Sequence, residues 1–189
     1  WWQHGYTHQM LYRKNRLGKP IQTMNLQYFG ELDFLEKSLL DKGWQVQPKS
    51  PVLHVLSYLS DSDSKNRTPF NTGVFNDRKP TLQMVKFLPQ FNQQILLQIW
   101  ESHLVIRDNL LPIYVGIISF ENFKNSWEIN ESEKIFLDFN NPENPQFQLT
   151  KFLKGYHWKV IYLPNSKPID PKHDLSFGGY LLLIKQHTY

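Results

Sequence analysis

The chain has 189 residues, a formal net charge of +4 and 15% aromatic residues, which is the size and composition of one folded domain. The absence of cysteine excludes disulfides, thiolate metal sites and a cysteine nucleophile. The sequence contains no apolar run long enough for a membrane-spanning helix and no P-loop, GxSxG or HExxH motif.

The first 20 residues are predicted to form an N-terminal extension, followed by a single domain over residues 21–189. Aromatic residues precede a basic cluster in this extension, a pattern typical of a juxtamembrane segment on the cytoplasmic side. A solvated basic arm or linker is the other interpretation, and the start without Met indicates a piece of a longer chain. The residues expected to be membrane-proximal are Trp1, Trp2, Arg13, Lys14, Arg16 and Lys19.

The first half of the domain combines one alternating segment with leucines at helical spacing. Alternation of apolar and polar residues predicts a half-buried strand, and leucines three or four residues apart predict helices. The expected elements are a strand at 21–28, a helix at 31–42, an extended stretch at 44–46, a helix at 51–60 and a long polar loop at 61–80.

The second half is dominated by apolar and alternating runs, which predict strands. The expected elements are strands at 81–87, 94–101 (with a continuation at 103–107) and 112–120, an ambiguous segment at 121–131, a strand at 133–139, a helix at 146–154, and strands at 156–163 and 177–185. This order predicts an α+β domain, a mostly antiparallel mixed sheet with two to four helices packed on one face.

Few residues have a spacing that indicates chemistry. Glu101 and His103 lie two apart in a predicted strand and therefore share one face, as a general acid and base would. A solvent-facing strand end explains the same spacing. No metal-ligand spacing occurs beyond an incidental His4 and His8 pair, so neither a metal nor a cofactor is expected.

Several short runs resemble a known family in their order along the chain. Asn25–Gly30 (NLQYFG) is followed by an amphipathic segment and by Gly43-Trp44, then by Asn76–Pro80 (NDRKP), Leu97–Trp100 (LQIW) and Pro112–Gly116 (PIYVG). This succession is similar to the LssY-like C-terminal domain over residues 21–120. The chain departs from the family pattern at Asn76, where His is frequent, and at Gln98, where Arg is frequent.

The resemblance implies a bacterial domain that is often appended to lipid-phosphatase-like or DedA-like membrane units and has no established reaction of its own. We therefore expect a non-catalytic accessory or interaction domain outside the membrane. Its expected partners are a membrane-embedded domain or protein and anionic lipid, without nucleic acid. Function tends to reside in loops, so Asn76, Asp77 and Arg78 of the 61–80 loop are candidate ligand-binding residues. Trp100 and Tyr114, on the predicted aromatic strands, are the other two candidates.

Two alternatives from other functional classes stay open. One is a hydrolase acting on phosphorylated or lipid-linked substrates, whose catalytic candidates are Asp77, Arg78, Glu101 and His103. The other is a nucleic-acid-binding domain, which the net positive charge permits but no recognition motif supports. The sequence favours the non-catalytic role over both.

Overall fold

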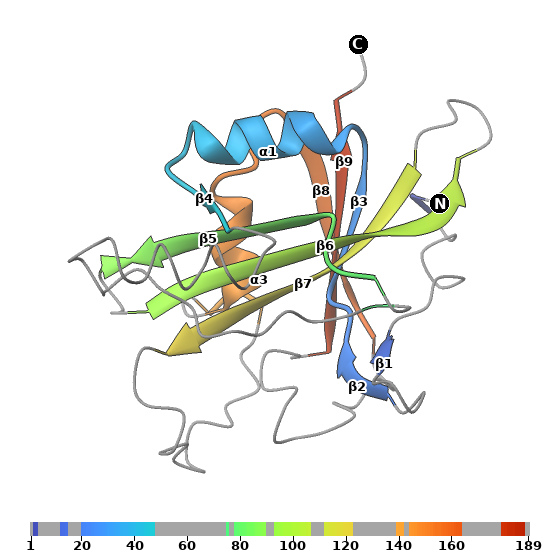
Figure 1. Cartoon of the computed structure of the whole chain (residues 1–189), viewed down its shortest axis with the longest axis horizontal. Helices are drawn as coiled ribbons and strands as arrows, with labels where there is room; N and C mark the ends of the chain where they lie inside the picture. Colours follow the sequence, from blue (N-terminus) through green and yellow to red (C-terminus); the bar gives the residue numbers. More distant parts are fainter. Residues whose placement is uncertain are drawn as a thin grey trace.

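The computed structural model describes residues 2–3, 12–14, 20–47, 75, 78–89, 93–106, 112–122, 139–141, 144–163 and 179–187. The strands among these residues form two sheets (Figure 1). A small sheet pairs β1 (Tyr12–Lys14) with β2 (Pro20–Thr23). The large sheet has seven strands in the order β4-β5-β6-β7-β3-β9-β8. They are β3 (Leu26–Phe29), β4 (Gln45–Val46), β5 (Leu82–Leu88), β6 (Gln93–Val105), β7 (Pro112–Asn122), β8 (Tyr156–Tyr162) and β9 (Tyr180–Gln186).

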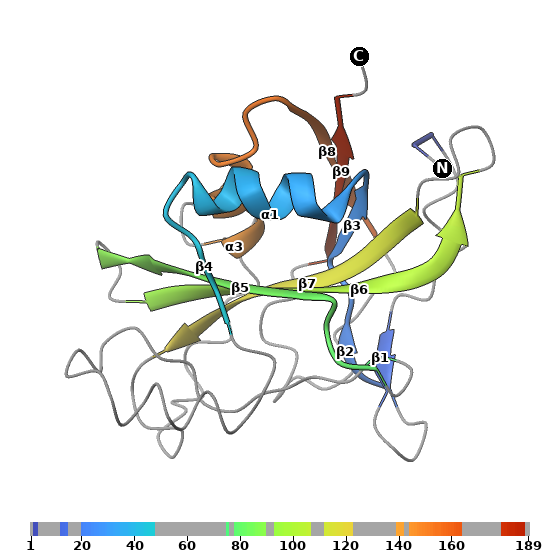
Figure 2. The same cartoon turned by 45° about the horizontal axis from the view of Figure 1, so that its top comes forward.

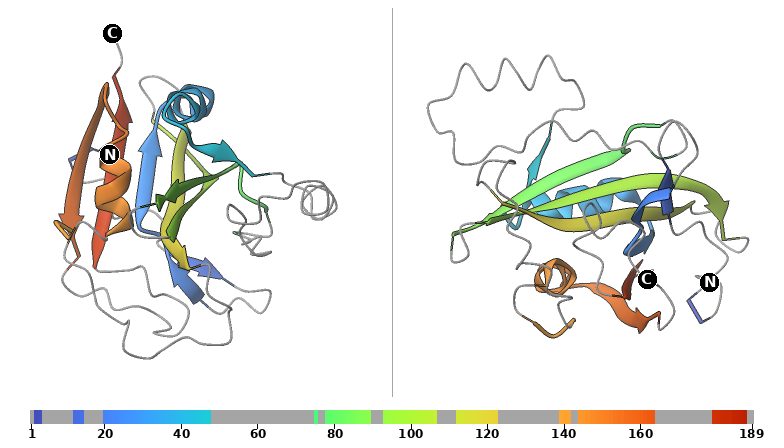
Figure 3. Two further views of the ribbon diagram at one scale, coloured as in Figure 1. Left: turned by 90° about the vertical axis from the view of Figure 1, so that its left-hand side faces the viewer. Right: turned by 90° about the horizontal axis from the view of Figure 1, so that it is seen from below.

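The parallel pair β3–β9 joins the beginning and the end of the domain. Leu26 lies opposite Leu182, and Phe29 lies opposite Lys185. The other neighbouring strands of the large sheet are antiparallel. The sheet is strongly twisted, so that β8 and β9 turn away from β5 and β6 (Figure 3).

Two helices lie on the same side of β5, β6 and β7 (Figure 2). Helix α1 (Leu32–Leu40) buries Leu35 and Leu39, which the four-residue spacing places on one face. Helix α3 (Pro145–Thr150) begins where the Asn144 side chain accepts hydrogen bonds from the backbone N–H groups of Gln146 and Phe147, at 2.8 and 3.3 Å. This is the usual N-cap arrangement, with proline at the first helical position.

The core occupies both faces of the large sheet. On the helix side, Leu35, Leu39 and Leu149 pack against strand residues that include Leu26 and Leu182. On the opposite side, a smaller cluster contains Met24, Phe75, Trp100, Val115 and Ile117. The alternation of side chains along β6 and β7 supplies both clusters.

The predicted α+β class is wrong, because the described residues form a mostly β domain. Strands β6 and β7 have 13 and 11 residues, whereas α1 and α3 have nine and six. The helix predicted at 146–154 ends at Thr150, because Lys151, Phe152 and Leu153 donate to carbonyls three residues back and close tighter turns. The predicted helix at 51–60 lies outside the described residues.

Other elements were predicted with varying success. The helix at 31–42 is confirmed as α1, and the strands at 81–87, 112–120 and 156–163 correspond to β5, β7 and β8. The single strand predicted at 21–28 is wrong. It is divided between β2 and β3, because Met24 and Asn25 leave the regular ladder between them.

Candidate functional site

The family-like run that begins at Asn25 forms a buried junction between strands. The Asn25 side chain donates to the Ile118 carbonyl and accepts from the Ile118 N–H, both at 2.8 Å. Its backbone carbonyl accepts from Leu182 N–H at 2.9 Å and from the Gln146 side chain at 2.7 Å. Asn25 therefore links β7, β9 and α3, which gives it a structural role.

Gly30 lies where the end of β3 meets the end of β9. Gln186 Oε1 accepts from Glu31 N–H at 2.7 Å and from the Tyr28 hydroxyl at 3.4 Å. A Cβ atom at Gly30 would stand 2.6 Å from the side chains of both Gln186 and Tyr28. The glycine is therefore required by this close approach.

Three tyrosines gather beneath the first half of α1. The Tyr28 ring lies 6.0 Å from the Tyr114 ring and 6.3 Å from the Tyr156 ring, measured between centroids. Burial raises the pKa of Tyr28 and Tyr114, and the nearby Glu101 and Asp33 carboxylates raise the pKa of Tyr114 further. These phenols therefore stay protonated at neutral pH.

Tyr156 joins this cluster to the helix itself. Its hydroxyl donates to the Phe34 carbonyl at 3.3 Å and contacts Ser38 Oγ at 3.0 Å. Burial raises the pKa of Tyr156, and the hydrogen bond with Ser38 opposes part of that rise. Tyr156, together with Tyr28, whose hydroxyl donates to the Glu31 carbonyl at 2.8 Å, thus holds α1 on the sheet through neutral hydrogen bonds.

The predicted ligand-binding residues are only partly described. Asn76 and Asp77 lie outside the described residues. Arg78 is exposed, and its carbonyl accepts a hydrogen bond from Trp100 Nε1 at 3.2 Å. The Trp100 side chain is 1% exposed and belongs to the core on the face opposite the helices. Trp100 therefore serves packing and offers a ligand almost no surface.

The acid–base candidates lie near the end of β6. Glu101 is exposed and pairs with Tyr114, which is half-buried. Adjacent strand residues point to opposite faces, so Glu101 points away from the face that holds Trp100. His103 belongs to β6, but its side chain is outside what the structure describes. Of the predicted residues, the structure brings Arg78 to Trp100 and Glu101 to Tyr114, as two separate pairs.

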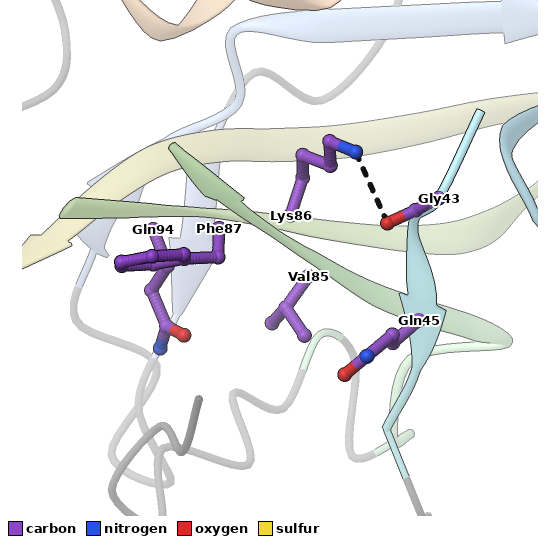
Figure 4. Close-up of a pocket in the computed structure, with 6 residues that line it drawn as sticks. All are labelled: Gly43, Gln45, Val85, Lys86, Phe87 and Gln94. Carbon is purple, nitrogen blue, oxygen red and sulfur yellow. Dashed lines mark hydrogen bonds between the residues drawn. The ribbon is translucent and has the colours of Figure 1, made fainter. Parts of the chain in front are cut away.

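A hollow of about 150 Å³ lies beside β5 (Figure 4). Lys86 of β5 points toward the end of α1. Its Nζ donates to the carbonyls of Lys42 and Gly43 at 2.8 and 3.2 Å. Cations stabilise helix C-termini in this position. The hollow is smaller than typical ligand pockets. Among the described residues that line it, Lys86 is the only charged one, and it already bonds the helix end. The remaining residues that line it are Gln45, Val85, Phe87 and Gln94.

Neither a metal cluster nor a membrane span is found in the described parts of the chain. Within them, no three His, Asp or Glu side chains are grouped in a way that could hold a metal ion. Neither α1 nor α3 is long and apolar enough to cross a bilayer.

The strands β8 and β9 and the residue after them carry several basic side chains on the face away from the helices. His157 lies opposite Lys185, and the alternation along β8 puts Lys159 on the same face as His157. The ring centroids of His157 and His187 are 3.9 Å apart, which places His187 beside them. We call His157, Lys159, Lys185 and His187 the basic face. Tyr156 and Val160 point from β8 to the core instead.

An aromatic residue from the chain's beginning lies on the basic face. Lys159 Nζ donates to the Trp2 carbonyl and stands 4.8 Å from the centroid of the Trp2 ring. The Trp2 ring is half-buried. The structure thus combines two lysines, two histidines and a tryptophan on one surface.

The other predicted membrane-proximal residues are described less fully. Arg13 lies in β1 and is only 8% exposed, so it adds little to any charged surface. Trp1, Arg16 and Lys19 lie outside the described residues, and so does the side chain of Lys14.

Sequence reasoning missed the basic face. Its residues come from two stretches of the chain, 157–159 and 185–187, which are separated by 25 residues. One signal was available, because residues 144–169 and 175–189 contain five lysines and two histidines but no Asp or Glu. These basic residues come together on one surface only when β8 and β9 pair.

A family model described as LssY C-terminus matches residues 6–129 of the chain. No curated protein and no solved structure matches the chain. The match covers the strands from β1 to β7, whereas the basic face lies beyond it.

Proposed function

The chain belongs to the LssY C-terminus family, and from this premise we propose that it is a non-catalytic accessory domain of a membrane-associated protein. In this proposal the domain attaches to anionic lipid headgroups through the basic face. The neighbouring membrane-embedded domain or protein holds it close to that surface.

The observation that carries the proposal is the charge of the β8–β9 pair. Lys159 and Lys185 share one face with His157 and His187. The segments that contain them have no carboxylate residue, at 144–169 and 175–189. A surface of one sign attracts phosphate groups of the opposite sign over about a Debye length, roughly 8 Å at physiological salt.

Trp2 supports a membrane surface as the source of those phosphates. Its ring contacts Lys159 on the basic face, and tryptophan is enriched at the headgroup level of bilayers. Lysines near an anionic leaflet contribute about 1 kcal/mol each. Because positive residues stay on the cytoplasmic side, we propose that side for the domain.

The hydrolase alternative receives no comparable support from the described residues. Glu101 pairs with Tyr114 on the helix side, while Arg78 contacts Trp100, which points to the other side. An active site needs its groups to converge on one reacting atom. Asp77 and the His103 side chain lie outside the described structure, so the hydrolase stays an untested prediction.

The experiment is co-sedimentation of the chain with vesicles of phosphatidylcholine, with and without phosphatidylserine, at low salt. We expect binding only to the vesicles that contain phosphatidylserine. The double variant Lys159→Gln/Lys185→Gln removes two charges, about 2 kcal/mol in all, and should weaken binding about 30-fold.

A matched control is the double variant Lys37→Gln/Lys42→Gln. Lys37 and Lys42 are exposed on α1 and just after it, away from the basic face. The control changes the net charge by the same amount and should leave binding nearly unchanged. Equal loss in both double variants would mean that net charge alone, and no particular face, controls the attachment.

A further inference from the structure

Strand β6 of the β6–β7 hairpin extends beyond its neighbour β5. Pairing of β5 with β6 ends at Leu82 opposite Ile99, whereas β6 continues with β7 to Val105 opposite Pro112. Among the described strands, none pairs with β6 past Ile99 on the side of β5. On the other side of the hairpin, β3 pairs with β7 as far as Phe29 opposite Ile113. The outer end of β6, which we call the hairpin end, therefore has one free edge, on the side of β5 (Figures 1 and 2).

The hairpin end exposes apolar side chains beside polar ones. Leu104 is 44% exposed and Val105 is 56% exposed, and Glu101 is exposed as well. Consecutive strand residues point to opposite faces, so each face of this end carries one exposed apolar side chain. Removing such a side chain from water is favourable where an apolar surface covers it.

The hairpin end keeps its shape without a strand on the side of β5. The register shifts between Glu101 and Leu104, and Ser102 lies within this irregularity. Ser102 Oγ donates to the Ile113 carbonyl at 2.6 Å and accepts from Leu104 N–H at 3.3 Å. Such bulges fix the course of a free strand and discourage edge-to-edge association. The apolar side chains are thus held in a defined position.

The basic face and the hairpin end lie toward the same end of the molecule. The Trp2 segment contacts Lys159 of the basic face. Figures 1, 2 and 3 all show this segment at the end of the molecule toward which the outer part of β6 and β7 points. A flat anionic surface could therefore contact both at once.

We propose that Leu104 and Val105 insert into the boundary between headgroups and acyl chains when the basic face binds an anionic bilayer. This inference rests on the proposed function, because the lysines attract the chain to the bilayer and the hairpin end inserts below the headgroups. The lysines alone would give purely salt-sensitive attachment. The apolar end adds a contribution that salt does not screen.

The absence of cysteine from the chain permits a direct test with one attached fluorophore. Val105→Cys, labelled with the environment-sensitive dye NBD, should shift to shorter wavelength and gain intensity on phosphatidylserine-containing vesicles. Leu40→Cys is the control, because Leu40 is also an exposed apolar residue, at 45% against 56% for Val105, but lies at the end of α1. Its label should keep the spectrum it has in water.

A second measurement separates insertion from attachment. Leu104→Ser/Val105→Ser should weaken vesicle binding about tenfold, since half-exposed Leu and Val side chains lose apolar contact. The remaining binding should keep the salt dependence of the original chain, which depends on Lys159 and Lys185.

Each outcome has a distinct meaning. If the chain binds vesicles while the label at residue 105 stays in water, insertion is overturned and the proposed function stands. If neither vesicle composition retains the chain, the proposed function fails and the insertion falls with it. A spectral shift without vesicles that grows with protein concentration would show that a second copy covers the hairpin end, which also overturns insertion.

Discussion

At the scale of single residues, the family-like run serves mainly to join parts of the fold. The side-chain amide of Asn25 bonds the backbone N–H and carbonyl of Ile118, as a neighbouring strand would. Gly30 leaves room for the Gln186 side chain. Neither residue faces a ligand pocket among the described residues. The run that identifies the family is therefore a structural signature, which explains why it indicates no reaction.

Asn25→Ala should destabilise the fold by about 2–5 kcal/mol, because it leaves the Ile118 N–H and carbonyl buried without their partners. Urea unfolding followed by tryptophan fluorescence measures this change. Gln45→Ala is a suitable control, since Gln45 is an exposed amide at the sheet edge and its loss should cost under about 0.5 kcal/mol. Equal costs would contradict the role assigned to Asn25.

Tyr28 should make stability fall at alkaline pH. Its pKa is raised by burial in the folded chain, so its contribution is complete below the unfolded tyrosine value of about 10 and declines above it. Tyr28→Phe removes this ionisable hydroxyl. The free energy of unfolding of the variant should therefore fall less steeply above about pH 10, by about 1.4 kcal/mol per pH unit. Unfolding in urea from neutral to alkaline pH checks this, and parallel curves for the two proteins would refute it.

At the scale of elements, α1 and the central strands could be predicted from local pattern. Leu35 and Leu39 repeat at helical spacing, and the apolar run at 112–120 is long enough for a buried strand. The pairing of β3 with β9 could not be predicted, because its partners are separated by most of the chain. The basic face could not be predicted for the same reason, since it exists only once β8 lies beside β9.

The end of α1 offers a test at this scale. Gly43 has φ of 76° and follows the helix, and an added Cβ would stand 2.9 Å from Lys86 Nζ. Gly43→Ala should therefore lose both the favourable left-handed turn, about 1 kcal/mol, and part of the Lys86 contact with the helix carbonyls.

Gly155→Ala is the matched control. Gly155 has φ of 88°, but no atom lies within 4 Å of its added Cβ. It should show the backbone cost alone, so that Gly43→Ala is the more destabilising of the two in urea unfolding. The reverse order would show that Lys86 does not stabilise the helix end.

At the scale of the whole molecule, the family match and the basic face occupy different parts of the chain. Residues 6–129 carry the match, and β8 and β9 complete the large sheet from beyond it. The parallel pairing of β3 with β9 joins these two parts. The segment that completes the sheet is thus also the one we propose to contact the membrane.

The most direct test of this account is the salt dependence of binding to phosphatidylserine-containing vesicles, for the original chain and for Lys159→Gln/Lys185→Gln. Screening acts on the charges that contact the lipid. We predict that binding of the original chain weakens steeply with salt and that the variant binds more weakly with a shallower dependence. Two curves of the same slope and affinity would contradict the assignment of the basic face as the membrane-binding surface.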